Sequence, residues 1–226
     1  MPTANQILGL RSSCASAGTT VATVGAGYAR DTTDSDWIEI PSGQTRDVDL
    51  SHTGIGGLDT GTVQPKTAYA LYVVKTAGGV VAAYASQSYV APSSLPGGAV
   101  FRRVGSLFTN STSKVVAFQQ TGTGNDRVVT FESDAGDLVV VANQSSATFK
   151  DFDNSPPASK KLNQSQVQCT PSTGGTTELR GAGSVVTTVT VPSVVWISIP
   201  PTSSWGQFRT PVGTTTLSVI GFGESV

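Results

Sequence analysis

The sequence predicts an all-β protein: an antiparallel sandwich or a jelly-roll-like domain with an extended N-terminal segment. Its 226 residues include 30 Thr, 27 Ser, 25 Gly and 12 Pro. Val and Thr favour strands because β-branched side chains are stiff at χ1. Short apolar runs end at Gly, Pro, Asn or Asp about every ten residues, as in sandwiches and small barrels. No window sustains a 3.6-residue apolar period, so we expect no helix longer than about two turns.

The first clear strands are expected after residue 35. Residues 37–40 form a short apolar run, and residues 46–50 alternate, with Val48 and Leu50 on one face. Such alternation is typical of a half-buried strand. Residues 1–35 are dominated by small side chains and carry only a weak pattern, so we expect them to form an N-terminal arm or anchoring segment. A loosely packed first layer, with a strand over Thr20–Val24, is the alternative.

The middle of the chain predicts a meander of paired strands. Residues 69–75 form an apolar strand with both faces covered, and residues 80–86 pair with it across a Gly-containing turn. Residues 92–98 follow as a rigid connector, because proline fixes the backbone angle φ. Further strands are expected at residues 101–108, 114–120, 127–131 and 138–141.

Residues 36–226 are expected to form one β-sandwich domain. A Pro-, Ser- and Gly-rich excursion is expected within it at about residues 150–182, a stretch longer than a usual loop. Strands resume at residues 185–191 and 194–199, and residues 214–220 close the domain.

Charge and composition exclude several function classes. Only 13% of residues are charged and the net charge is −1, so we expect no surface for nucleic acid. The apolar runs are far shorter than the ~20 residues of a membrane span. The start of the chain has no cationic or long apolar region of the kind found in export signals, so we expect folding in the cytoplasm. Cys14 and Cys169 are then expected to be reduced thiols.

The residues predict no catalytic centre and no cofactor. His52 is the single histidine, and no Gly-x-Ser-x-Gly motif occurs to supply a nucleophile for it. We expect His52 to be a solvated loop residue. One histidine and two distant cysteines also fail to supply the ligands of a zinc site. The protein is therefore expected not to be an enzyme.

Two segments carry residues that could bind a ligand. Residues 31–36 contain three Asp, which suit Ca²⁺, but the run lacks the Gly and the final carboxylate of an EF-hand loop. We interpret this run as a solvated loop and leave Ca²⁺ open. Trp205 and Phe208 stand in a polar segment flanked by Pro and Gly, and we expect them to be exposed for contact with a sugar or a partner.

An ordered series of short motifs spans residues 49–129. The motifs are Leu58-Asp59-Thr60-Gly61, Tyr69-Ala70-Leu71-Tyr72-Val73-Val74, Ala85-Ser86-Gln87-Ser88, Ala91-Pro92, Leu95-Pro96-Gly97-Gly98, Arg102-Arg103-Val104-Gly105-Ser106 and Phe118-Gln119. Their order and spacing resemble a module of tailed-bacteriophage structural proteins, above all tail-fibre and other virion-surface proteins. Ala99 departs from that module, in which an aromatic residue follows the glycine.

The resemblance implies a non-enzymatic virion protein that folds in the host cytoplasm. A tail fibre, a spike or another adhesion device is the leading hypothesis. A capsid decoration or head-fibre protein and a lectin-like carbohydrate-binding module are the alternatives. The expected partners are further copies of the chain, in a trimer, other virion proteins, and a host surface glycan or receptor.

Arg102 and Arg103 are neighbours in an expected strand, so their side chains point to opposite faces. At least one is then expected to point toward the interior or a subunit interface, where a guanidinium needs a carboxylate or carbonyl partner. With Trp205 and Phe208, these arginines are the candidate ligand or interface contacts.

Overall fold

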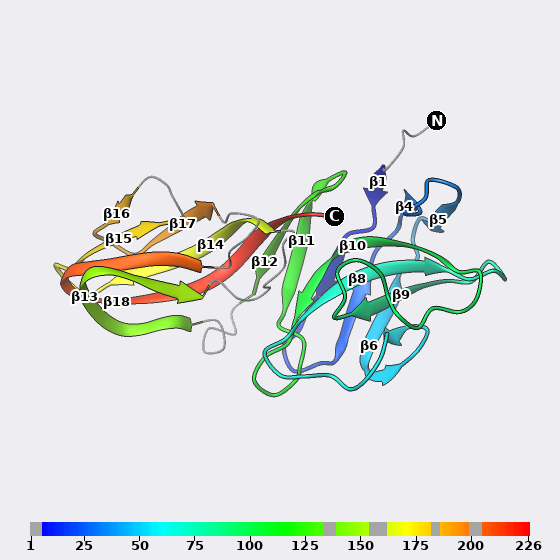
Figure 1. The fold of residues 1–226 in the computed structure, drawn as a ribbon, viewed down its shortest axis with the longest axis horizontal. Helices are drawn as coiled ribbons and strands as arrows, with labels where there is room; N and C mark the ends of the chain where they lie inside the picture. The colour runs from blue at the N-terminus through cyan, green and yellow to red at the C-terminus, as the bar shows by residue number, and fades with distance from the viewer. Residues whose placement is uncertain (1–5, 133–138, 154–161, 182–185, 199–204) are drawn as a thin grey trace. The chain divides into compact units, whose positions relative to one another are not determined.

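The computed structural model describes residues 6–132, 139–153, 162–181, 186–198 and 205–226 (Figure 1). These residues form strands, turns and bends and no helix, which confirms the all-β prediction. No helix that could cross a membrane is found in this described part of the chain.

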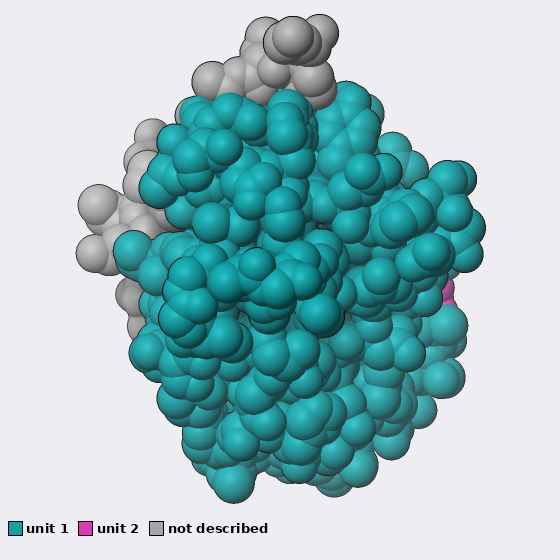
Figure 2. Space-filling view, turned by 90° about the vertical axis from the view of Figure 1, so that its right-hand side faces the viewer, with its two compact units in different colours: residues 1–127, 226 teal, residues 128–225 magenta. Residues whose placement is uncertain are grey.

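The chain divides into two compact units. Unit 1 comprises residues 1–127 and Val226, and unit 2 comprises residues 128–225; Figure 2 shows a face of unit 1. The boundary falls inside β12 (Asp126–Phe131) and not at residue 35. Where the sequence suggests one domain over residues 36–226, the structure has a separate hydrophobic cluster in each unit.

A mixed sheet forms the main part of unit 1. Its strands follow the spatial order β10, β8, β9, β7, β6, β3, β2, β11. Their bounds are β2 Ser12–Cys14, β3 Val21–Val24, β6 Arg46–Thr53, β7 Gly57–Leu58, β8 Ala68–Lys75, β9 Val81–Ser86, β10 Val100–Phe108 and β11 Phe118–Thr123. The short β7 runs parallel to β6 and β9, and the other pairs are antiparallel. The predicted β8–β9 hairpin is confirmed.

The N-terminal residues form strands where the sequence suggests an arm. β1 (Ile7–Gly9), β4 (Gly27–Arg30) and β5 (Trp37–Ile40) make a separate antiparallel sheet, and β2 and β3 belong to the main sheet. Small residues let these strands approach closely: a Cβ atom on Gly27 would lie 2.3 Å from the carbonyl oxygen of Leu8. The weak apolar pattern thus reflects tight backbone packing.

β8 is central to the core of unit 1. Its residues 69–74 are all buried, so both faces of the strand are covered, as a continuous apolar run predicts. On one face, β8 packs with β9 and with the connector between β9 and β10, residues 87–99, which contains the expected rigid segment 92–98. This cluster contains Ala70, Tyr72, Val74 and Tyr84, against which Tyr89, Leu95, Ala99 and Phe101 pack.

Unit 2 is organised around one long strand, β18 (Trp205–Ser225). It pairs with β13 (Val139–Asp153), β14 (Leu162–Pro171) and β15 (Thr176–Arg180). β14 also pairs with β17 (Ser193–Ser198), and β15 with β16 (Thr187–Val189).

The range expected as a Pro-, Ser- and Gly-rich excursion, at about residues 150–182, contributes β14 and β15 to unit 2. In β15, Thr177 and Leu179 are buried and their neighbours are not, so a two-residue period is present within this polar sequence. The part of the range at residues 154–161, with residue 182, lies outside the described residues.

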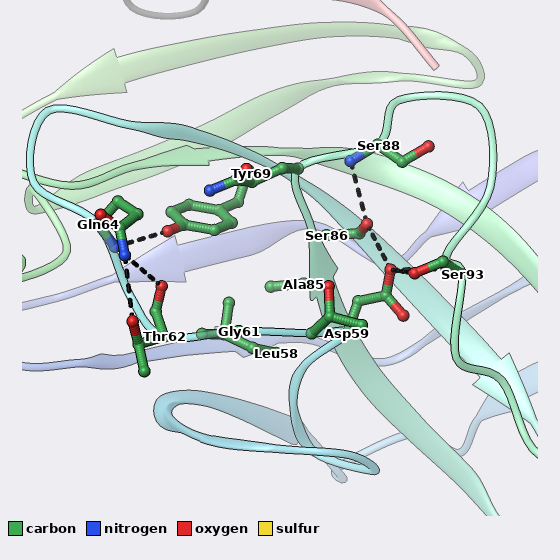
Figure 3. Close-up of a pocket in the computed structure, with 12 residues that line it drawn as sticks. Leu58, Asp59, Gly61, Thr62, Gln64, Tyr69, Ala85, Ser86, Ser88 and Ser93 are labelled. Carbon is green, nitrogen blue, oxygen red and sulfur yellow. Dashed lines mark hydrogen bonds between the residues drawn. The ribbon is translucent and has the colours of Figure 1, made fainter.

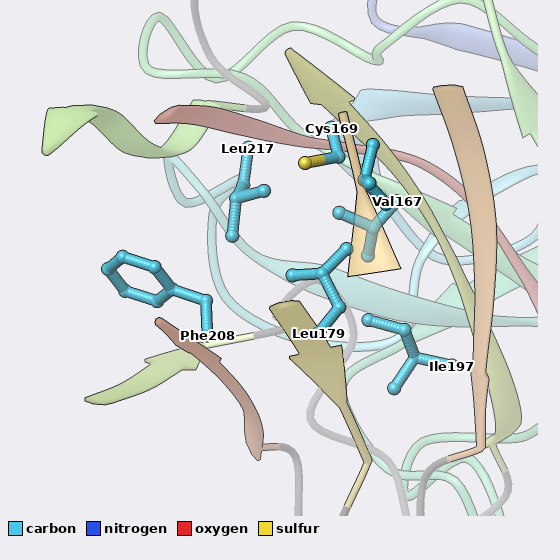
Figure 4. Close-up of a cluster of buried hydrophobic side chains, with 7 residues drawn as sticks. Val167, Cys169, Leu179, Ile197, Phe208 and Leu217 are labelled. Carbon is cyan, nitrogen blue, oxygen red and sulfur yellow. The ribbon is translucent and has the colours of Figure 1, made fainter. Parts of the chain in front are cut away.

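Seven buried side chains form the core cluster of unit 2 (Figure 4). They are Val167, Cys169, Leu179, Val189, Ile197, Phe208 and Leu217. Phe208 is only 2% exposed, so the expectation that it is an exposed contact residue is wrong. It alternates with Gln207 and Arg209 along β18, and the period of the strand turns it inward.

Candidate functional site

A hollow in unit 1 is lined by residues from three of the short motifs found in the sequence (Figure 3). Its volume is about 460 Å³, and it lies between the loop after β7, the end of β9 and the connector that follows β9. The residues that line it are 58–62, 64, 69, 85–88 and 93. Motifs that are separate in the sequence therefore meet at one place.

Asp59 holds this hollow together. It is 4% exposed, and its carboxylate accepts hydrogen bonds from the hydroxyls of Ser86 and Ser93, each at 2.9 Å. It also accepts from the backbone amides of Ser93 and Ser94, each at 2.7 Å. The Asp59 amide donates to the carbonyl of Ala85 at 2.7 Å. Asp59 thus ties the end of β9 and the connector to its own loop.

These contacts also fix the charge of Asp59. Burial raises the pKa of this carboxyl, but the hydrogen bonds from Ser93, Ser94 and Ser86 outweigh burial and hold the pKa below its usual value. Asp59 is therefore an ionised acceptor whose oxygens are occupied, and it is poorly suited to act as a general base.

The hydroxyls of two buried tyrosines form hydrogen bonds with the backbone of the connector. The Tyr72 hydroxyl donates to the carbonyl of Ser88 at 2.8 Å, and the Tyr84 hydroxyl to that of Ser94 at 3.1 Å. Burial raises the pKa of Tyr72 to about 12, so its hydroxyl stays a donor at neutral pH. The connector is therefore held through both side chains and backbone.

Arg102 and Arg103 of β10 are 8% and 7% exposed, so both side chains are buried. The sequence predicted that at least one of them points inward. An Arg102 amino group donates to Asn125 Oδ1 at 3.3 Å, and burial lowers the pKa of Arg102. The Arg103 guanidinium lies 5.6 Å from the centre of the Tyr89 ring in the connector. Both arginines thus contact other parts of unit 1.

The hollow is suited to hydrogen bonding with a polar ligand. Its exposed lining consists of hydroxyl and amide side chains. These belong to Thr60, Thr62, Gln64, Gln87 and Ser93, with Ser88 half-buried beside them. The lining residues include no histidine, lysine or cysteine, so none of them pairs a nucleophile with a base in the way that covalent catalysis requires.

A second hollow, of about 690 Å³, adjoins the first, because Gly61 and Thr62 line both. It contains His52, which lies in β6 and not in a loop. The His52 side chain is 52% exposed, as predicted for a solvated residue, and its Nδ1 lies 4.0 Å from Asp49 Oδ2. Gly57 packs against it: a Cβ atom there would lie 2.4 Å from the His52 carbonyl oxygen.

Asp31 organises the acidic run at residues 31–36 through hydrogen bonds to its carboxylate. The Asp31 carboxylate accepts from the amides of Thr33, Ser35 and Asp36 at 3.1, 2.7 and 2.8 Å. Burial raises the pKa of Asp31, but these bonds and one from the Thr33 hydroxyl lower it to about 2. Asp36 pairs with Lys75 at 2.8 Å. These two carboxylates therefore serve the fold, and the described residues contain no group of three or more metal-binding side chains.

Three further residues named in the sequence analysis are Trp205 and the two cysteines. Trp205 begins β18 opposite Asp153, and its side chain lies outside the described part. Cys14 and Cys169 are free and buried, which confirms the prediction of reduced thiols.

Asp59 belongs to one of the short motifs, but the sequence alone assigned it no role. The signal that could have identified it is its isolation, because it is the only charged residue between His52 and Lys66.

No protein-family model matches this chain, and no curated protein matches it.

Proposed function

We propose that the chain is a non-enzymatic structural protein of a bacteriophage virion and forms part of a tail fibre, a spike or another adhesion device. The observation that carries this proposal is that two of the phage-like motifs, the one at residues 58–61 and the one that contains Ser86, meet at Asp59. Asp59 also binds Ser93, in the segment that leads to the next motifs, so the three residues form one hydrogen-bonded framework (Figure 3). The framework gives these two motifs a structural reason to occur together.

The chemistry of the two hollows supports a structural role over a catalytic one. Asp59 has its oxygens occupied. His52, the only histidine, lies in the adjoining hollow with its nearest carboxylate at 4.0 Å. A hydrolytic centre needs a nucleophile and a base within about 3 Å of each other.

The cysteines and the composition support a virion in particular. Both thiols are free and buried, which suits folding in a reducing compartment. The Gly-, Ser- and Thr-rich strands are typical of proteins that act outside the cell. A virion protein meets both conditions, because it folds in the host and acts outside it.

The experiment is to purify virus particles from a lysate of the infected host on a density gradient. The particles are then labelled with gold-conjugated antibodies against this chain. We expect the chain to be present in the particle fraction by mass spectrometry. Electron microscopy is expected to show gold at the tail, on its fibres or at its tip.

Gold on the head surface instead of the tail would favour the alternative, a capsid decoration or head-fibre protein. A control antibody against an unrelated cytoplasmic protein measures the background. If the chain were missing from particles that carry their other structural proteins, the virion proposal would be wrong.

A lectin-like module is the second candidate function, favoured by the hydroxyl and amide lining of the first hollow. Such groups match the hydroxyls of sugars, and its volume lies in the range of small-molecule sites. A glycan array tests this candidate. A lectin is expected to retain a defined set of glycans, and Gln87→Ala is expected to weaken that binding, with the exposed Gln44→Ala as control.

A further inference from the structure

We infer that the second hollow of unit 1, the one that contains His52 and Lys114, binds a sugar that carries an anionic group, either a carboxylate or a phosphate. The choice of a sugar rests on the adhesive role proposed above. The requirement for an anion rests on the charges of the hollow itself.

Four segments of unit 1 build this hollow. They are Thr20, just before β3, the end of β6, the loop at residues 61–63 and the turn at residues 112–114. Its volume of about 690 Å³ exceeds that needed for a single sugar ring and lies within the range of small-molecule sites.

Lys114 is the charged group that points to an anion. It is half-buried and lines the hollow. Only the backbone of Lys114 forms hydrogen bonds with described residues. Its amide donates to Asn110 Oδ1 at 2.9 Å, and its carbonyl accepts from the Asn110 amide at 2.7 Å. Among the described residues, no acceptor lies within hydrogen-bonding distance of its ammonium group. A half-buried cation of this kind gains from an anionic ligand.

The carboxylate of Asp49, which contacts the lining residues Thr20, Ser51 and His52, is already engaged. Asp49 accepts hydrogen bonds from the Thr20 hydroxyl at 2.7 Å and the Ser51 amide at 2.9 Å. It also lies 4.0 Å from the His52 imidazole. The Asp49 carboxylate is therefore engaged by groups on the His52 side of the hollow, and no hydrogen bond joins it to Lys114.

The turn that carries Lys114 is fixed in advance of binding. Asn110 Oδ1 accepts from the amide and the hydroxyl of Thr112, as well as from Lys114. The Ser113 amide donates to the Asn110 carbonyl at 3.1 Å. A prearranged turn loses little conformational entropy when a ligand binds.

The remaining walls suit a sugar. The hydroxyls of Thr53 and Ser113 make no hydrogen bond to any described residue, so they are open to the hydroxyls of a ligand. Val63, which is half-buried, adds apolar surface for the C–H groups of a sugar ring. Hydroxyl groups beside an apolar floor match the alternating polar and apolar surface of a pyranose.

The experiment measures the affinity of four probes for the full chain by isothermal titration calorimetry. The probes are glucuronic acid, glucose 6-phosphate, glucose and inorganic phosphate. We expect the two charged sugars to bind at least tenfold more tightly than glucose and than inorganic phosphate. The stronger of the two identifies the preferred anion.

Variants then assign the binding to this hollow. Lys114→Gln is expected to reduce the preference for the charged sugars over glucose to within about twofold. Lys114→Arg keeps the charge and is expected to retain the preference. Lys150→Gln, an exposed lysine of unit 2, is the matched control and is expected to bind like the parent.

Three results would overturn the inference. Equal binding of glucose and glucuronic acid would remove the anion requirement, and equal binding of inorganic phosphate and glucose 6-phosphate would reveal a site for a bare anion. An unchanged preference in a folded Lys114→Gln variant would place binding elsewhere. None of these results bears on whether the chain is present in particles, so the failure of the virion proposal remains distinguishable.

Discussion

At the scale of single residues, Asp59 is predicted to contribute strongly to the stability of unit 1. Asp59→Asn keeps the shape of the side chain, but it weakens several charge-assisted bonds and turns an amide donor toward other donors. We expect a loss of about 2–4 kcal/mol in the free energy of unfolding, measured by urea titration. Asp47→Asn is the control, because Asp47 is exposed and accepts from Thr23. Equal effects of both changes would contradict the role of Asp59.

The lowered pKa of the Asp31 carboxyl predicts how the stability of the fold depends on pH. Its folded pKa of about 2 lies below the ordinary value of 3.8, so it stabilises the fold above pH 3.8. This contribution is lost as the pH falls from about 4 toward 2. We expect the urea midpoint of the parent to fall across that window, and that of Asp31→Asn to be lower at pH 7 and to fall less. Parallel curves for the two proteins would contradict this account.

Phe208 shows why a flanking sequence misleads at this scale. The Pro and Gly residues around it suggested a loop, but long strands tolerate such residues at exposed or irregular positions, and β18 has several register shifts. Phe208→Ala is expected to cost about 3–5 kcal/mol by leaving a cavity in the core of unit 2. Val212→Ala, at a position that is 56% exposed, is expected to change stability by less than about 0.5 kcal/mol. Similar thermal unfolding curves for the two variants would place Phe208 outside the core.

At the scale of elements, the strands that the sequence predicted well are those with large apolar side chains. β8 and β9 were predicted within one residue, because Tyr69–Val74 is continuous in apolar residues and a Gly-rich turn follows. β1, β2 and β4 were missed, because Gly, Ala and Ser carry little hydrophobic signal while permitting close backbone contact. The framework around Asp59 could not be derived from the sequence, because it depends on tertiary contacts between separate motifs.

Gly27 tests whether the N-terminal residues belong to the fold. In Gly27→Ala, the added Cβ would lie 2.3 Å from the Leu8 carbonyl oxygen, so β1 and β4 could not keep their register. We expect a loss of about 2–4 kcal/mol by urea unfolding. Gly97→Ala is the control, since no atom lies within 4 Å of its added Cβ. If both variants matched the parent, residues 1–35 would behave as an arm after all.

At the scale of the whole molecule, we predict a homotrimer. Charged side chains, which normally protect strand edges, make up only 13% of the chain. Each unit also exposes large apolar residues: Val80 and Val90 in unit 1, and Val194 and Trp196 on β17 of unit 2. Closed symmetry would cover such surfaces without forming filaments.

Light scattering at micromolar concentration measures the oligomer directly. We expect a mass roughly three times that of the 23.1 kDa chain. Val194→Lys combined with Trp196→Lys places charges on β17 and is expected to lower that mass, whereas Val212→Lys serves as a control on β18. A monodisperse monomer of the parent protein would contradict the oligomer.

The central claim is that this chain is a structural part of a virion adhesion device. The most direct measurement is a cryo-electron microscopy map of intact particles, detailed enough to trace strands. We predict density at the tail fibre, spike or tail tip that fits unit 1, including the β10–β8–β9 sheet and the connector fastened to Asp59. A fully assigned particle map with no density for this chain would contradict the account.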